Sequence, residues 1–128
     1  MNTPGKRILI VEDGQTLNRM IQFLLRSRGY IIEYAYDGME ALEVLKKNTP
    51  HAIILDLMMP KMNGYKLLEK LKKDDQHKRT PIIILSSLDA GTNSKKLLSM
   101  GACDYIEKPF MSAAFLEKVS NALATSVN

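Results

Sequence analysis

Residues 52–56, Ala52-Ile53-Ile54-Leu55-Asp56, place four apolar side chains in a row and end on a carboxylate. A run this short, without alternating polar residues, is typical of a strand that is buried on both faces. Four more short apolar runs, each bounded by Gly, Pro, Asp or Ser, follow the same pattern; they lie at residues 8–11, 30–35, 82–85 and 105–106. The sequence therefore predicts five strands, of which 105–106 has the weakest signal.

Helical patterns fill the segments between the predicted strands. In the first, five apolar residues follow the i, i+3, i+4, i+7, i+8 spacing of one helix face: Leu17, Met20, Ile21, Leu24 and Leu25. Four later segments carry shorter stripes, namely Ala41, Leu42 and Leu45; Leu67, Leu68 and Leu71; Leu97 and Leu98; and Leu116, Val119 and Leu123. We expect these stripes to face the sheet.

Residues suited to helix ends lie at the borders of these segments. Asp37 and Glu40 have the spacing of a capping box, and the third helix is expected to begin near Asn63-Gly64. Gly101 lies where a left-handed C-terminal cap would fall, and Ser112 is the predicted N-cap of the fifth helix.

A strand followed by a helix, repeated five times, indicates an α/β fold. Such a (βα)5 order implies a doubly wound parallel sheet with right-handed crossovers and helices on both faces. Ligands of these open sheets bind outside the carboxyl ends of the strands, near the point where the strand order reverses.

The length and charge of the chain narrow its class. The 128 residues fit one domain, and the single cysteine, Cys103, cannot form an internal disulfide. No stretch resembles a membrane span or a secretory signal, so we expect a cytoplasmic protein. The net charge of +4 is interleaved with acidic residues along helical stretches. Direct binding to nucleic acid is therefore not expected.

Polar residues that can support chemistry follow four of the five predicted strands: Glu12-Asp13, Asp56, Ser86-Ser87 and Lys108-Pro109. Taken singly, each has a structural explanation, because Asp caps helices, Asp and Ser form turns and Lys is usually a solvated charge. A parallel sheet brings them to one edge, however, where three carboxylates would repel one another unless a cation or a proton offset their charge.

Phosphoryl transfer explains this combination of groups. Oxygen-only ligation by carboxylates suits Mg²⁺, which also recruits phosphate oxygens. A carboxylate such as Asp56 can accept a phosphoryl group covalently, while Lys108 supplies positive charge and Ser86 a hydroxyl. The sequence therefore predicts a phosphoryl-transfer site.

Five segments, in this order and spacing, resemble the receiver domain of two-component response regulators: Ile8-Leu-Ile-Val-Glu-Asp13, Ile53-Ile-Leu-Asp56-Leu-Met-Met-Pro60, Gly64, Pro81-Ile-Ile-Ile-Leu-Ser86 and Lys108-Pro109. The resemblance covers nearly the whole chain and implies a flavodoxin-like five-stranded sheet with strand order 2-1-3-4-5. It also implies one receiver domain over residues 1–128, of the single-domain, chemotaxis-regulator type, with no output domain.

The resemblance assigns a role to each matching residue. Asp56 corresponds to the phosphoacceptor, and Glu12 and Asp13 to the acidic pair that holds Mg²⁺ together with Asp56. The backbone carbonyl of Met58 corresponds to a further metal ligand.

The remaining matches concern the response to phosphorylation. Ser86 and Lys108 correspond to the hydroxyl and the ammonium group that contact the phosphoryl group, and Tyr105 to an aromatic switch residue. Tyr105 is equally well explained as a partly buried edge residue. Pro109 corresponds to a proline that often follows a cis peptide bond.

By resemblance, the chain is a bacterial signalling switch rather than an enzyme in its own right. A sensor histidine kinase or a histidine phosphotransfer protein would donate the phosphoryl group. A protein target would bind the face formed by the fourth helix, fifth strand and fifth helix. The chain would be a monomer or a weak, phosphorylation-dependent dimer. Met58 and Leu88 occupy positions that tune dephosphorylation in the family, and because both are apolar we expect slow self-dephosphorylation.

Three alternatives use the same sequence features. An aspartyl-nucleophile phosphatase of the haloacid-dehalogenase type would need a second aspartate where Met58 stands. A flavin-binding electron carrier would need a phosphate-binding loop, whereas Glu12-Asp13 would repel phosphate. A phosphorylation-independent adaptor would keep the fold, although such proteins usually lose the acceptor or the acidic pair.

Overall fold

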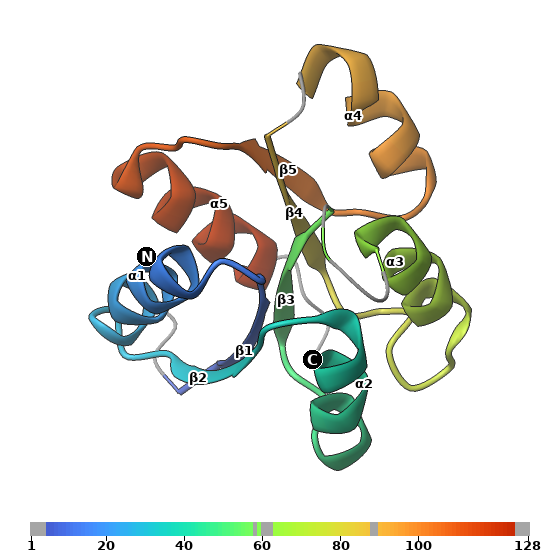
Figure 1. Ribbon diagram of the computed structural model, residues 1–128. Helices are drawn as coiled ribbons and strands as arrows, with labels where there is room; N and C mark the ends of the chain where they lie inside the picture. The colour runs from blue at the N-terminus through green and yellow to red at the C-terminus, as the bar shows by residue number, and fades with distance from the viewer. Residues whose placement is uncertain (1–4, 58, 60–62, 88–89, 125–128) are drawn as a thin grey trace.

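The computed structural model describes residues 5–57, 59, 63–87 and 90–124. Within these residues, five strands and five helices alternate along the chain (Figure 1). They are β1 (Arg7–Val11), α1 (Gln15–Arg26), β2 (Ile31–Ala35), α2 (Gly38–Lys47), β3 (Ala52–Asp56), α3 (Gly64–Lys73), β4 (Ile82–Ser86), α4 (Ala90–Ser99), β5 (Asp104–Glu107) and α5 (Ser112–Ala124).

The strands form one parallel sheet in the order β2-β1-β3-β4-β5, which confirms the predicted topology. The register aligns Val11 with Leu55, and Asp56 with Leu85. Because the three central strands end within two residues of one another, the residues that follow them meet at the same edge of the sheet.

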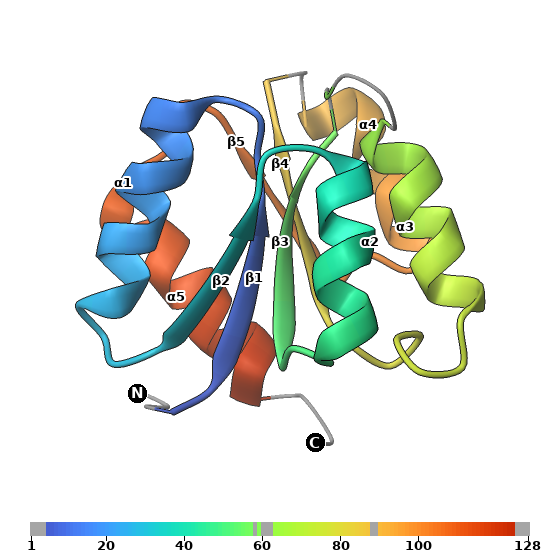
Figure 2. The ribbon, with the colours of Figure 1, turned by 60° about the horizontal axis from the view of Figure 1, so that its bottom comes forward.

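Helices cover both faces of the sheet, with α1 and α5 on one side and α2, α3 and α4 on the other (Figure 2). Successive apolar residues of the central strands point to opposite faces. In β3, for example, Ile53 and Leu55 belong to the core beneath α2, α3 and α4, whereas Ala52 and Ile54 belong to the core beneath α1 and α5. Two cores on one sheet explain why these runs have no polar alternation.

The two edge strands differ from the prediction of strands buried on both faces. Only Ala35 of β2 and Ile106 of β5 are buried, while Ile31 and Tyr34 are exposed. Each edge strand has a neighbour on one side only, so helices cover it incompletely. Burial on both faces is confirmed for β1 from Ile8 onward and for β3 and β4 throughout.

The predicted helix stripes are mostly correct, with two exceptions among the described side chains. Met20 is 43% exposed and Leu98 is 48% exposed, so neither faces the sheet. In α1 the residues buried beside Ile21 and Leu25 include two amides, Asn18 and Gln22. The stripe rule assigns inward positions by hydrophobicity, and it misses polar groups that bond to strand ends.

The helix ends largely follow the sequence prediction. Asp37 accepts a hydrogen bond from the Glu40 amide at 2.8 Å, but Oε1 of Glu40 accepts from the amide of Tyr36 rather than from that of Asp37. Asn63 caps α3, and Gly101 has a left-handed φ of 105°. Ser112 is the first residue of α5 and not its N-cap. None of the described helices has the length and apolar character needed to span a membrane.

Candidate functional site

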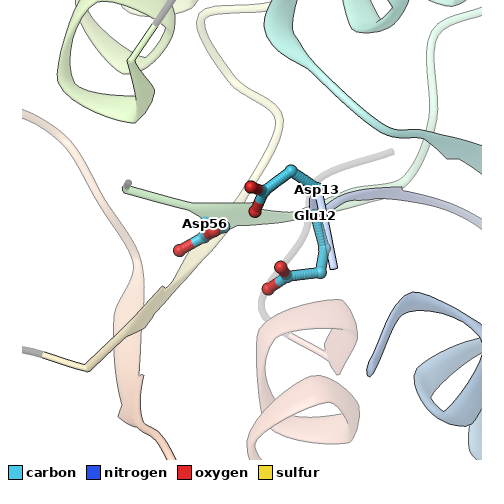
Figure 3. A group of neighbouring side chains, drawn as sticks. All are labelled: Glu12, Asp13 and Asp56. Carbon is cyan, nitrogen blue, oxygen red and sulfur yellow. The ribbon is translucent and has the colours of Figure 1, made fainter. Parts of the chain in front are cut away.

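Three carboxylates gather at the carboxyl ends of β1 and β3. Glu12 and Asp13 follow β1 directly, and Asp56 is the last residue of β3. One oxygen from each of the three side chains lies within 4.8 Å of the others. Figure 3 shows the three side chains gathered at this edge of the sheet. The arrangement predicted from the strand order is therefore present.

The three carboxylates differ in their surroundings. Glu12 and Asp56 are buried, whereas Asp13 is exposed. Glu12 is held in place, because its Oε2 accepts a hydrogen bond from the amide of Gly14 at 2.9 Å. Within the described residues the Asp13 side chain has no hydrogen bond or ion pair, so its carboxylate is open to a ligand from solvent.

Lys108 brings a positive charge from the end of β5 into this cluster. Its Nζ lies 2.8 Å from Oε1 of Glu12 and 3.3 Å from Oδ1 of Asp56. Burial lowers the pKa of Lys108, but its bonds to Glu12 and the charges of Asp56 and Glu12 outweigh that effect and raise the pKa above its ordinary value. The lysine therefore stays charged and offsets part of the carboxylate repulsion.

The backbone around Lys108 fixes its position. Its amide donates to the carbonyl oxygen of Ser86 at 2.7 Å, which joins the ends of β4 and β5. The peptide bond between Lys108 and Pro109 is cis. Ser86 is itself buried at the end of β4, one residue past the register partner of Asp56.

Tyr105 lies farther back, on β5, and is partly buried against the core beneath α2, α3 and α4. Lys118 of α5 donates to the carbonyl oxygen of Tyr105 at 2.9 Å and to Oδ1 of Asp104 at 3.1 Å. Its ammonium group also lies 5.2 Å from the centre of the Tyr105 ring. This lysine, which sequence reasoning missed, connects α5 to β5.

Gly64 packs directly against the backbone that follows the strand β3. Its amide donates to the carbonyl oxygen of Leu57 at 2.8 Å. A Cβ at position 64 would lie 2.6 Å from the Cα of Leu57 and would also collide with the carbonyl oxygen of Asp56. Only glycine permits this approach of α3 to the acidic cluster.

Two predicted site residues, Met58 and Leu88, lie outside the described residues. The predicted roles of the Met58 carbonyl as a metal ligand and of both side chains in dephosphorylation therefore remain predictions.

The donor set fits a hard divalent cation. It consists of carboxylate oxygens only, and it includes the solvent-accessible carboxylate of Asp13. Oxygen ligands with open positions for water suit Mg²⁺ better than metals that prefer nitrogen or sulfur.

Comparison with known proteins identifies the family. The family model of the response regulator receiver domain matches residues 8–120. The chain belongs to this family. Receiver domains are signalling switches that histidine kinases phosphorylate.

Individual relatives agree with this assignment. Hybrid signal transduction histidine kinase D from Dictyostelium discoideum is 38% identical over 91% of this chain and 7% of its own length. The chain spans about half the length, or less, of curated relatives that it matches.

Solved receiver domains share the fold. That of a histidine kinase from Syntrophus aciditrophicus matches with a TM-score of 0.88 and 32% identity, covering 97% of this chain and 94% of that one. The receiver domain of the sensor histidine kinase PA1611 from Pseudomonas aeruginosa matches with a TM-score of 0.85 and 28% identity, over 94% and 99% of the two chains. That structure holds a magnesium ion in its active-site cleft.

Sequence reasoning also missed the buried amides beneath the acidic cluster, Asn18 and Gln22. Their only signal is a pair of amides four residues apart in the helix that follows Glu12-Asp13. Two such residues share one helix face. Solvated amides have the same spacing, so the sequence alone does not separate the two cases.

Proposed function

We propose that this receiver domain accepts a phosphoryl group on Asp56 in a Mg²⁺-dependent reaction. The observation that carries the proposal is the gathering of three carboxylates within 4.8 Å, with Lys108 in contact with two of them. An acidic cluster that served only to cap helices or form turns would not need a partly buried lysine between two of its members.

In the transfer step, a carboxylate oxygen of Asp56 attacks the phosphorus atom of a phosphohistidine. The new O–P bond forms as the P–N bond breaks, and the electron pair of that bond returns to the imidazole ring. Lys108 stabilises the negative charge on the transferring oxygens. The distance of 3.3 Å between its Nζ and Oδ1 of Asp56 supports this role.

Glu12, Asp13 and Asp56 would hold the Mg²⁺ ion, with the Met58 carbonyl as a further ligand. Bound there, the ion supplies charge neutralisation for the incoming phosphoryl group. Asp13 is the most accessible of the three carboxylates, which favours it as a direct ligand.

The signal would pass from Asp56 toward β5. In this proposal Ser86 moves to donate its hydroxyl to the phosphoryl group, and Tyr105 turns inward. These movements reshape the surface formed by α4, β5 and α5, where a protein target binds or a weak dimer forms. Coupling of this kind is typically worth about 1–3 kcal/mol.

The donor would be a sensor histidine kinase or a histidine phosphotransfer protein. The receiver domain would act as a regulator in the cytoplasm of a bacterium. The interleaved charges of the sequence support a protein partner over direct binding of nucleic acid.

The test is covalent labelling with acetyl phosphate in the presence of Mg²⁺, followed by intact-protein mass spectrometry. We expect one phosphoryl increment that disappears with EDTA and in Asp56→Asn. Asp75→Asn, which removes an exposed carboxylate far from the cluster, should be labelled like the wild type. If neither acetyl phosphate nor a histidine kinase labelled the protein, the result would favour a phosphorylation-independent adaptor.

The lifetime of the phosphoryl group forms a separate part of the proposal. Apolar side chains at Met58 and Leu88 cannot orient an attacking water molecule by hydrogen bonding. We therefore expect slow self-dephosphorylation, which polar substitutions at both positions should accelerate. A wild-type half-life of seconds that does not change in these variants would contradict this expectation.

A further inference from the structure

A buried amide network lies directly beneath the acidic cluster. Asn18 of α1 is fully buried, and its Nδ2 donates to the carbonyl oxygen of Glu12 at 2.9 Å and to that of Ala35 at 3.2 Å. Its Oδ1 accepts a hydrogen bond from Nε2 of Gln22 at 2.8 Å. The amide nitrogen of Asn18 therefore makes both of its donor bonds, and the amide oxygen accepts one.

These bonds join the ends of two strands. The Glu12 amide donates to the carbonyl oxygen of Ala35 at 3.1 Å, which is the last backbone bond between β1 and β2. Asn18 adds a side-chain bridge just beyond it. One of its two acceptors, the Glu12 carbonyl, belongs to the peptide group that links Glu12 to Asp13. The bridge therefore fixes the plane of that peptide.

The Glu12–Asp13 peptide determines the position of the Asp13 side chain more than it determines the position of the Glu12 side chain. The Glu12 side chain is held by Gly14 and by Lys108. The Asp13 side chain, in contrast, is exposed and has no bonding partner in the described part of the chain. Repulsion from Glu12 and Asp56 would move it outward if the backbone were free to rotate.

We propose that Asn18 is the positioning residue of the Mg²⁺ site and that it holds the Glu12–Asp13 peptide so that the Asp13 carboxylate stays within reach of the ion. This inference rests on the proposed function. Asn18 contacts no metal ligand atom and acts only through the backbone. It resembles the outer-shell residues of other metal sites, whose substitution weakens metal binding about 10- to 100-fold.

The network also explains why an amide is required at position 18. Both strand-end partners are carbonyl oxygens, which only accept hydrogen bonds. A carboxylate at this position would face two acceptors and would lose both bonds. Gln22 fixes the orientation of the Asn18 amide, because its Nε2 donates to the Asn18 oxygen.

The experiment measures Mg²⁺ affinity by isothermal titration calorimetry for the wild type, Asn18→Ala and Gln22→Met. Asn48→Ala is the matched control, since it removes an amide that donates to Oε2 of Glu33 at 2.9 Å, away from the acidic cluster. We expect Mg²⁺ binding about tenfold weaker in Asn18→Ala, a smaller loss in Gln22→Met and wild-type affinity in Asn48→Ala. Circular dichroism at each step reports the folded fraction.

Labelling with acetyl phosphate gives a second readout. In Asn18→Ala the Mg²⁺ concentration for half-maximal labelling should rise by the same factor, while the rate at saturating Mg²⁺ stays close to that of the wild type. A general loss of structure would lower both quantities. Should Asn18→Ala not fold, Gln22→Met decides the question, since it removes the donor that fixes the orientation of the Asn18 amide and thereby weakens both strand-end bonds.

Three outcomes would overturn the inference. Wild-type affinity in the folded Asn18→Ala and Gln22→Met variants would show that the network does not position the site. An equal loss in Asn48→Ala would show a general effect of destabilisation. A wild-type chain that does not bind Mg²⁺ would overturn the proposed function and the inference together, whereas the first two outcomes leave the proposed function intact.

Discussion

The ammonium group of Lys108 lies 0.5 Å closer to Glu12 than to Asp56, at 2.8 Å against 3.3 Å. The lysine therefore occupies the space among the carboxylates that a bound cation would share. Glu12 and Asp56 are buried, so separating either carboxylate from its positively charged partner costs free energy. Lys108 and Mg²⁺ should consequently compete for the same negative charge, although the proposed phosphoryl transfer uses both.

Replacement of Lys108 by Met should separate binding from chemistry. We expect Mg²⁺ binding to become roughly three- to tenfold tighter, because the competing positive charge is gone. Labelling of Asp56 should become about 100-fold slower, as expected when one charge-stabilising donor is lost. Calorimetry and the acetyl phosphate assay measure the two effects, with Lys47→Met, on the exposed side of α2, as the control. Weaker Mg²⁺ binding in Lys108→Met would contradict the competition.

Substitution of Gly64 by Ala should disturb both stability and the site. The added Cβ has to displace the backbone of Asp56 and Leu57, because neither partner is a flexible side chain. We expect a loss of about 2 kcal/mol in the free energy of unfolding, measured in urea, and slower labelling of Asp56. Lys66→Ala, which changes an exposed residue of the same helix, should change neither quantity. Unchanged stability in Gly64→Ala would show that α3 can shift without cost.

Lys118→Met should loosen the contact between α5 and β5. The substitution removes the bonds to Asp104 and to the Tyr105 carbonyl but keeps an apolar side chain of similar length. We expect about 1 kcal/mol of lost stability and faster amide hydrogen exchange in residues 104–107. Lys95→Met, on the exposed surface of α4, serves as the control. Identical exchange in the two variants would argue against any connection through Lys118.

His51 should make the fold less stable in mild acid. Burial, together with the charges of Lys6 and Arg7, lowers the pKa of His51 below its ordinary value of 6.5. Its Nδ1 also accepts a hydrogen bond from the amide of Arg7 at 2.9 Å, which a proton on that nitrogen would break. The unfolded chain therefore binds this proton more readily than the folded chain does.

The expected pH dependence follows from that difference. The contribution of His51 is fully present above pH 6.5 and is lost as the pH falls through that value toward the lower pKa of the folded state. Urea unfolding between about pH 7.5 and 5 should show a steeper loss of stability for the wild type than for His51→Gln. Parallel curves for the two proteins would rule out this role for His51.

The sequence was sufficient to predict the meeting of Glu12, Asp13 and Asp56, because it follows from a parallel sheet of alternating strands and helices, whereas the strand order came from the resemblance to receiver domains. Parallel strands deliver their carboxyl ends to one edge whatever their side chains are. The exposure of the edge strands was not predicted, since an apolar run such as 30–35 does not show how many neighbours its strand has.

The ion pairs of Lys108 and the bonds of Asn18 could not be predicted from the sequence. A hydrogen bond depends on atomic positions to within a fraction of an ångström, and residues such as Asn18 and Ala35 are far apart along the chain. Met20 shows the opposite error. Its spacing fits an apolar stripe that faces the sheet, but Met20 is exposed, and the polar Asn18 is buried in its place.

The buried carboxylates and the ammonium group of Lys108 come from parts of the sheet that differ in burial. Glu12 and Asp56 extend from central strands that are buried on both faces, whereas Lys108 follows the edge strand β5. Elements with fewer buried contacts open first in native-state fluctuations. An opening that begins at β5 would therefore withdraw Lys108 and leave the acidic residues in place. Such a transient form would be more anionic at its carboxyl edge and would capture divalent cations before the closed domain re-forms.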